Sequence, residues 1–311
     1  MKSDSPASLR RKIGSAADLQ SVVRAMKAQA AGNVGQYERS VAALADYARS
    51  VELGLGVCFR LEAHTAVAVP SPHKPAVEIR AIVFGSDQGL VGRFNDLVVG
   101  HAVDSLTQLP GKAQVWAVGE RVHANLLDAG MPVLGVFTVP TSVQAIAALV
   151  DEMLVTVLAE FFGSDLRTNS AEVHLFYNRP GLGSTFSPVS QRLLPLDQAW
   201  RRGLMLNPWP TGMLAETLGS PVTTLRALIR EYLFISLFRA CAESLASENA
   251  SRLAAMDRAD RNIDEMRSTL EDSLHRLRQA RIDEELSDVI SGFKALSEGA
   301  ANGVPGASTS S

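Results

Sequence analysis

Apolar residues near the N-terminus recur at alternating steps of three and four positions. They form one narrow stripe between about Ser8 and Leu55, made of Ile13, Ala16, Leu19, Val23, Met26, Ala30, Val34, Tyr37, Val41, Leu44, Ala48 and Val51. A stripe this narrow is typical of a helix that packs against one partner helix in a coiled coil. Ser8 is placed to cap the start. The pattern therefore predicts an N-terminal coiled-coil helix over residues 1–56.

A second, longer helix is predicted at the other end of the chain. No glycine or proline occurs between Pro221 and Gly292, and a continuous helix of roughly 70 residues would be on the order of 100 Å long. Ser220 and Pro221 supply a cap and a first-turn proline. Its apolar stripe is clearest in the distal part, at Ile263, Met266, Leu270, Leu274, Leu277, Ile282, Leu286, Val289, Phe293 and Leu296. We expect a coiled-coil helix over 220–298 and a disordered polar tail over 299–311.

In the middle of the chain, the spacing of apolar residues no longer follows the helical period. Four short runs rich in β-branched or aromatic residues are predicted strands, at 78–84, 114–119, 133–139 and 172–177. Helical stretches lie between them, at 93–109, 120–129 and 142–162. This alternation predicts a parallel sheet flanked by helices, within a domain over 57–219. Residues 186–196 suit an added edge strand because they contain Pro188, and Trp200–Met213 is predicted to be a loop.

The two stripe-bearing helices each need a partner surface. The economical solution is that they pack against each other, antiparallel, with the α/β domain inserted between them in sequence. The stretch Ala240–Met256 is rich in Ala, Ser and Cys. Small residues of this kind indicate either a closely packed helix pair or a helix that must also be slim. The fold class is thus α/β plus a long antiparallel coiled coil.

Composition excludes several classes of function. The chain has 311 residues and a formal net charge of −3, so no general attraction to nucleic acid is implied. Cys58 and Cys241 are far apart, which fits neither a disulfide framework nor a metal site and agrees with a reducing compartment. The first residues lack the apolar core of a signal peptide. The apolar run 145–162 contains three acidic residues, so we expect a buried or amphipathic helix and membrane contact only through partners.

No catalytic constellation is apparent in the sequence. The six histidines show no metal-ligand spacing, and no serine or cysteine lies in a nucleophile motif. Gly85, Gly89 and Gly92, between a predicted strand and a predicted helix, raise the question of nucleotide binding. Their spacing is not G-x-G-x-x-G and no phosphate-loop lysine follows. The alternatives are an anion site at a helix N-terminus and a tight strand-to-helix turn.

Three stretches carry a family resemblance. EYLFISLFRACAESLASENASRLAAMDRADRNIDEM and its continuation RQARIDEELSDVISGFKAL resemble the C-terminal helix of the gamma subunit of F-type ATP synthases. LRRKIGSAADLQSVVRAMKAQAA resembles that family's first helix, and GSDQGLVGRFN is similar to its S-D-x-G-L-C-G-x-x-N motif. The matches occur in the family's order and cover nearly the whole chain.

The resemblance implies a rotor shaft without catalytic residues, metal or cofactor. The coiled coil would lie inside a ring of alpha and beta subunits, and a Rossmann-like α/β domain would contact the epsilon subunit and the c-ring. Rotation of the c-ring would turn the shaft and change the conformation of the beta subunits. The chain would be a peripheral protein at the cytoplasmic face of the bacterial inner membrane. Contacts with the alpha/beta ring are implied for Met26, Lys27, Arg278, Gln279, Asp283 and Glu285.

The sequence also departs from the family pattern. Val91 replaces the usual cysteine of the glycine motif, Arg93 replaces a small residue, and Asp283 stands where threonine is common. These differences suggest a divergent gamma subunit, including the form found in alternative sodium- or proton-translocating ATPases. Two other hypotheses remain: an α/β nucleotide-binding enzyme with a coiled-coil oligomerisation arm, and a coiled-coil scaffold that self-associates.

Overall fold

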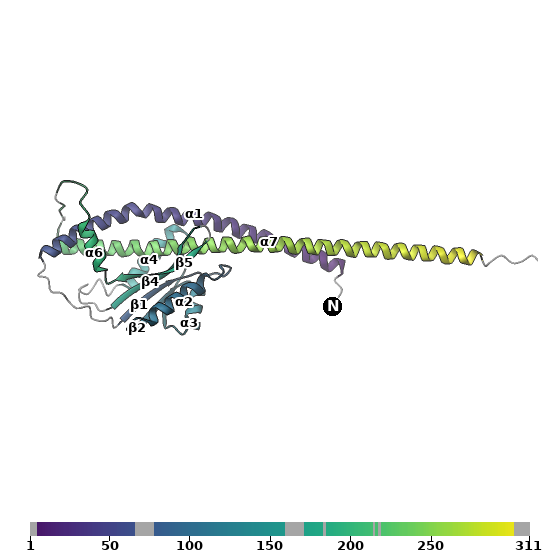
Figure 1. The fold of residues 1–311 in the computed structure, drawn as a ribbon, viewed down its shortest axis with the longest axis horizontal. Helices are drawn as coiled ribbons and strands as arrows, with labels where there is room; N and C mark the ends of the chain where they lie inside the picture. The colour runs from purple at the N-terminus through teal and green to yellow at the C-terminus, as the bar shows by residue number, and fades with distance from the viewer. Residues whose placement is uncertain are drawn as a thin grey trace, which may run out of the picture. The chain divides into compact units, whose positions relative to one another are not determined.

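The computed structural model describes residues 5–65, 78–158, 171–182, 185–213, 215–216 and 219–301. Two long helices, α1 (Pro6–Thr65) and α7 (Pro221–Ala301), enclose the remaining elements in sequence (Figure 1). The chain divides into two compact units, one made of residues 1–25 and 257–311 and the other of residues 26–256. Both helices contribute to both units, which are described separately below.

The ends of the long helices differ in part from the expectation. The backbone N–H of Ser8 donates to Ser5 Oγ at 3.2 Å, so Ser5 is the cap and the prediction of Ser8 is wrong. Pro6 occupies the first helical position, where its missing N–H is no loss. The start of α7 at Pro221 is confirmed. Residues 57–65, which the predicted boundary gave to the α/β domain, are helical. Residues 299–301, predicted to begin a disordered tail, still belong to α7, and 302–311 lie outside the described residues.

The second unit contains a five-stranded sheet of order β3-β2-β1-β4-β5. Its strands are β1 (Glu78–Phe84), β2 (Lys112–Val118), β3 (Val133–Phe137), β4 (Ala171–Pro180) and β5 (Phe186–Leu194). β1 runs parallel to β2 and β4, and β2 runs parallel to β3. β5 pairs antiparallel with β4 at the edge, which confirms the added edge strand. Pro188 fits there because an edge strand has a side that needs no ladder donor.

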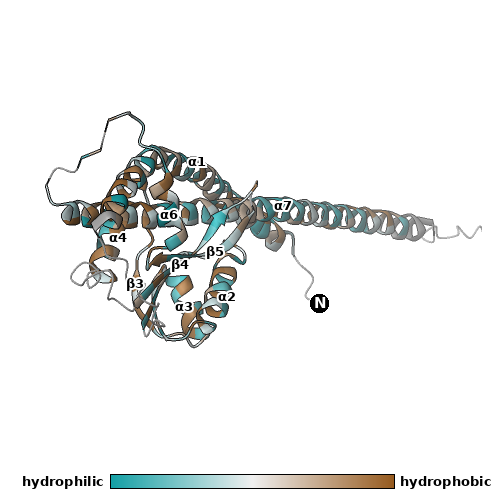
Figure 2. Cartoon of the chain, turned by 60° about the vertical axis from the view of Figure 1, so that its left-hand side comes forward, coloured by the Kyte–Doolittle hydropathy of each residue, from teal (hydrophilic) through white to brown (hydrophobic). Residues whose placement is uncertain are grey.

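Helices cover both faces of this sheet (Figure 2). One buried apolar cluster joins β1 and β2 to α2 (Phe94–Thr107) and α3 (Glu120–Asp128). A larger cluster joins the opposite face to α4 (Val143–Thr156) and to the parts of α1 and α7 in this unit. Residues 198–206 form a further helix, α6, so the prediction of a loop from Trp200 is wrong for its first half. Asp197 caps this helix by accepting from the backbone N–H of Trp200 at 2.8 Å.

The paired helices run antiparallel within each unit. In the second unit, Asn33 contacts Asn249 at 3.2 Å and Tyr47 Oη donates to Glu231 at 2.6 Å. In the first unit, Gln20 contacts Asp264, and Arg24 contacts Asp260 at 3.2 Å. In each case a later position on α1 meets an earlier position on α7. The antiparallel coiled coil is confirmed.

A polar residue replaces an expected leucine in the seam of the first unit. Leu19 is 53% exposed, whereas Gln20 is 2% exposed. Gln20 Nε2 donates to Asp260 at 2.9 Å and to Asp264, and Arg267 donates to Gln20 Oε1 at 2.8 Å. Met266 on α7 is likewise exposed, with Arg267 turned to the seam in its place. Leu19 and Met266 were therefore wrongly assigned to the buried stripes.

Replacing Gln20 with alanine should destabilise the full chain more than replacing Leu19. The variant Gln20→Ala strips a hydrogen-bond partner from three charged side chains and should cost about 1–3 kcal/mol. Leu19→Ala changes an exposed position and should stay within about 0.5 kcal/mol. Urea unfolding of the two variants measures the difference. A larger loss for Leu19→Ala would contradict the seam described above.

The distal part of α7 exposes the continuation of its stripe. Beyond Leu277, the side chains of Ile282, Leu286, Val289 and Phe293 are between 59% and 75% exposed. No other described segment of the chain covers them. Apolar residues that recur at helical spacing on an exposed face are typical of a surface for another protein.

Candidate functional site

The loop after β1, residues 85–92, lies where open α/β sheets usually bind ligands. That place is the crevice at the carboxyl ends of the parallel strands. Here Asp87 fills it: one carboxylate oxygen accepts from the backbone N–H of Glu120 at 3.1 Å, and the other accepts from that of Val139 at 3.2 Å. Glu120 is the first residue of α3. The N-terminus of α3 is therefore occupied by the chain's own carboxylate, whereas the helix that this loop opens, α2, has no side-chain cap.

Two glycines are required for close packing here, Gly85 in this loop and Gly119 directly after β2. A Cβ on Gly85 would lie 2.3 Å from Val122 Cβ, and a Cβ on Gly119 would lie 2.7 Å from the backbone of Ser86. Ser86 and Asn95 tie the turn together: Ser86 N–H donates to Asn95 Oδ1 at 3.0 Å and Asn95 Nδ2 donates to Ser86 Oγ at 2.9 Å. The glycine motif thus builds a tight strand-to-helix turn.

The two best-formed cavities of the described residues do not fit a nucleotide at this loop. One that touches it, lined by Gln88, Met26 and Arg252 among others, has a volume of about 70 Å³. A larger one of about 270 Å³ lies between α1 and α6, lined by Phe59 and Arg201 among others. Ligand pockets usually span about 300–1,000 Å³. The nucleotide-binding hypothesis therefore loses the site on which it depended.

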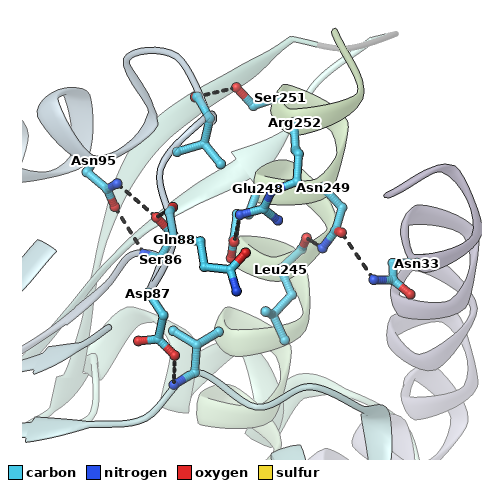
Figure 3. A network of polar contacts seen from close by, with 12 residues as sticks. Asn33, Ser86, Asp87, Gln88, Asn95, Leu245, Glu248, Asn249, Ser251 and Arg252 are labelled. Carbon is cyan, nitrogen blue, oxygen red and sulfur yellow. Dashed lines mark hydrogen bonds and ion pairs between the residues drawn. The ribbon is translucent and has the colours of Figure 1, made fainter. Parts of the chain in front are cut away.

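Polar contacts join this loop to α7 instead (Figure 3). Ser251 Oγ donates to the carbonyl of Val91 at 2.6 Å, and Ser247 Oγ donates to the carbonyl of Asn178 at 2.9 Å. Asn178 in turn donates through Nδ2 to the carbonyl of Phe94 at 2.9 Å. Both serines are buried. From the sequence, Ala240–Met256 was described only as rich in small residues. That pattern does not show whether a serine forms a hydrogen bond or only fills space as an alanine would.

A buried ion pair lies beside these serines on α7. Arg252 donates to Glu248 Oε1 at 2.7 Å, and both side chains are almost inaccessible to water. Burial raises the pKa of Glu248, and the nearby Arg252 offsets only part of that effect. Asp87, in the loop opposite, raises this pKa further. Glu248 is therefore a carboxylate held in an unfavourable environment by one cation.

Both cysteines should react slowly with thiol reagents in the folded chain. Cys58 and Cys241 are free and buried, and burial raises the pKa of each thiol. The thiolate is the reactive form, so few molecules are competent at neutral pH. We expect alkylation by iodoacetamide to be at least about a hundredfold slower than in denaturant, as judged by mass spectrometry. Equal rates in native and denaturing buffer would contradict this.

The structure places the predicted ring-contact residues in two separate groups. Met26 and Lys27 are half-buried on α1 in the second unit. Met26 shares the small polar cavity with Asn33, Asn249 and Arg252. The other four lie on exposed turns of α7 in the first unit, namely Arg278, Gln279, Asp283 and Glu285. Their contacts with another protein stay a prediction.

The described residues hold neither a metal-binding cluster nor a helix that could span a membrane. No group of three or more His, Cys, Asp or Glu side chains is arranged to hold a metal ion. None of the described helices combines the length and the apolar character that a membrane span requires.

The fold and the loop define a class of protein. It has an antiparallel pair of long helices and an inserted Rossmann-like domain in which Asp87 occupies the carboxyl ends of the strands. The family model described as ATP synthase matches residues 5–296. Gamma chains of ATP synthase from Pelotomaculum thermopropionicum and Nostoc sp. are 26% and 29% identical to this chain. Each alignment covers 93% of this chain and 98% of the relative. The chain belongs to the ATP synthase gamma family, whose members are non-catalytic subunits.

Solved structures agree at the level of the fold. A chain of the Euglena gracilis mitochondrial ATP synthase OSCP/F1/c-ring structure matches with a TM-score of 0.59 and 15% identity, over 98% of this chain and 99% of that chain. A central stalk/c-ring structure from Tetrahymena thermophila has a TM-score of 0.54 and 21% identity over 76% of this chain. The long helices and the mixed sheet are thus the fold of an ATP synthase central stalk.

Proposed function

We propose that this chain is the central rotor shaft of an F-type ATP synthase or ATPase. It couples ion-driven rotation of the c-ring to conformational change in the catalytic beta subunits. The observation that carries the proposal is the match to the gamma family over residues 5–296, together with a helix α7 that is continuous over 81 residues. A shaft needs length without a flexible joint, and α7 meets that need.

The partners follow from this role. They are the alpha, beta and epsilon subunits and the c-ring, with membrane contact only through the complex. Similar solved chains come from structures described as a rotor or as a central stalk with c-ring. The relatives include many bacterial gamma chains. The cytoplasmic face of a bacterial inner membrane is the location that fits.

The test is assembly with co-expressed alpha and beta subunits. A tagged chain should purify with both, and ATP hydrolysis by the complex should depend on its presence. A chain that stays alone and leaves the ring subunits unassembled would refute the proposal. Assembly without any change in hydrolysis would reduce the chain to a scaffold.

The contact residues on α7 can be tested in the same complex. The double variant Arg278→Ala, Gln279→Ala should slow ATP-driven rotation by about tenfold or more, because hydrogen bonds to charged groups contribute about 1.5–3 kcal/mol each. Arg276→Ala is the matched control, since Arg276 is exposed on the same turn and donates to the backbone carbonyl of Asp272 on its own helix at 3.4 Å. Equal rates of rotation for the two variants would show that Arg278 and Gln279 do not contact the alpha/beta ring.

A further inference from the structure

In the second unit, α7 contributes large apolar side chains, among them Leu237 and Leu245, to the same buried cluster as the sheet. Small side chains lie between them. Ala240, Ala242 and Ala246 are at most 2% exposed in this stretch of the second unit. Small side chains let the helix backbone approach the sheet, but apolar contact has no preferred direction. Such a surface resists separation better than it resists turning of the helix about its own axis. Directional contacts are needed to fix the angle of the helix.

Ser247 and Ser251 supply two directional contacts on one face of α7. They are four residues apart, so their side chains lie one above the other. Ser247 donates to the carbonyl at Asn178, near the end of β4, and Ser251 donates to the carbonyl of Val91 in the loop after β1. The two acceptors come from different parts of the domain. Two such points, one turn apart, define the rotation of the helix relative to the sheet.

Both acceptors are themselves held in place. The side chain of Asn178 is bonded to the carbonyl of Phe94 at the start of α2. Val91 lies between Leu90, with φ 63°, and Gly92, with φ 58°. A leucine in the left-handed region is strained, and such strain persists only where neighbouring contacts impose it. The bond from Ser251 is one of the contacts that hold this loop.

A third contact reaches α7 from α1. Asn249 donates through Nδ2 to the carbonyl of Leu245 on its own helix, at 2.8 Å, which orients its side chain. Its Oδ1 accepts from Asn33 Nδ2 at 3.2 Å. Figure 3 shows Asn33 approaching α7 from the side away from the loop. Over little more than one turn, α7 is therefore hydrogen-bonded to the α/β domain on one side and to α1 on the other.

We infer that Ser247 and Ser251 are positioning residues that lock the rotational angle of α7 to the α/β domain. A rotation of the α/β domain then turns α7 by the same angle. This inference rests on the proposed function. It gives two hydroxyl groups a share in the transfer of torque, beside the ion pair of Arg179 with Glu243 at 3.1 Å and the contact of Asn33 with Asn249. Their hydroxyls act through the helix and touch no substrate.

The experiment compares the double variant S247A/S251A with S244A in the assembled complex. Ser244 is a matched control because it is 3% exposed on the same helix and its Oγ has no hydrogen-bond partner. A probe fixed to the α/β domain reports its angular fluctuation while the alpha/beta ring is immobilised. The variance should rise by about twofold in S247A/S251A, since the directional contacts are lost and the apolar packing is kept. S244A should match the wild type.

Hydrogen exchange of the unassembled full chain gives a second readout. Amides of residues 86–92 should exchange about tenfold faster in S247A/S251A than in S244A, while those of β1 stay unchanged. Equal fluctuation and equal exchange in the two variants would overturn the inference and leave the rotor proposal intact. Failure of the wild-type chain to assemble would overturn the rotor proposal instead, and the exchange data would still decide whether the serines fasten the loop.

Discussion

Replacing Gly119 with alanine should lower the free energy of unfolding by about 3 kcal/mol or more. Gly119 has φ 112° and precedes α3, and this backbone region is nearly restricted to glycine. The added Cβ would also lie 2.7 Å from backbone atoms of Ser86, which cannot move without disturbing the loop after β1. Urea unfolding of the full chain, followed by circular dichroism, measures the loss.

Variants at two other glycines distinguish the cost of backbone strain from the cost of the clash with Ser86. Gly130 also has a positive φ, of 74°, but a Cβ there meets nothing within 4 Å. Gly130→Ala should therefore cost only the backbone strain, about 1–2 kcal/mol. Gly100 lies inside α2 with open space around it, and Gly100→Ala should stabilise by about 0.5–1 kcal/mol. If Gly119→Ala lowers the free energy of unfolding no more than Gly130→Ala does, then the backbone of Ser86 does not lie as close to Gly119 as described.

Replacing Arg252 with methionine should produce a large and pH-dependent loss of stability. The change leaves the buried Glu248 without its cation, and breaking a buried pair in this way costs about 3–5 kcal/mol. Burial already raises the pKa of Glu248, and removal of Arg252 raises it further. A carboxyl group whose pKa is raised in the folded state contributes stability below its unfolded pKa and loses it as the pH rises.

The deficit of Arg252→Met should therefore be small at about pH 4, near the usual pKa of glutamate, and should grow as the pH rises toward about 8. Unfolding curves across this range, each measured against the wild type, give the profile. In the double variant with Glu248→Gln the charge is absent, so the difference from wild type should lose its steep rise with pH. A deficit of constant size for Arg252→Met would show that Glu248 is not the group responsible.

The elements with strong periodicity were predicted correctly from the sequence. The run at 78–84, and that at 133–139 as far as Phe137, form strands because β-branched residues between turn residues have few alternatives. Pro188 identified the edge strand for a similar local reason. Predicted helix 142–162 is confirmed as far as Thr156, with 159–162 outside the described residues. Local patterns suffice where local preference and burial agree.

One error came from contacts that a single segment does not show, and two came from local signals that were missed. Gln20 rather than Leu19 faces the seam because Asp260, Asp264 and Arg267 satisfy its amide, and these lie on the other helix. A count of apolar positions necessarily prefers the leucine. The loop predicted after Asp197 hid α6, whose cap is local but whose glycines and prolines suggested a break. Ser5 was overlooked although its contact with the backbone N–H of Ser8 is local.

The site itself was less predictable than the fold. The glycine motif was recognised, but its sequence alone did not decide between an anion site and a turn. The turn is shown by the bonds between Ser86 and Asn95 and by the close approach of Gly85 to Val122. The carboxylate of Asp87 reaches backbone N–H groups far along the chain, at Glu120 and Val139. Ser247 and Ser251 were seen only as small residues. Their partners are backbone carbonyls, which carry no sequence signal.

The pairing of α1 with α7 has a consequence for how the chain is made. Gln20 meets Asp260 across a separation of 240 residues. A ribosome adds about 5–20 residues per second, so the seam of α1 waits roughly 12–50 s for its partner. During that time its apolar stripe is open to water and to other nascent chains. The α/β domain between the helices can fold meanwhile, and it then brings the ends of the two helices together. Synthesis of this protein thus has a vulnerable interval, which a chaperone that covers α1 would protect.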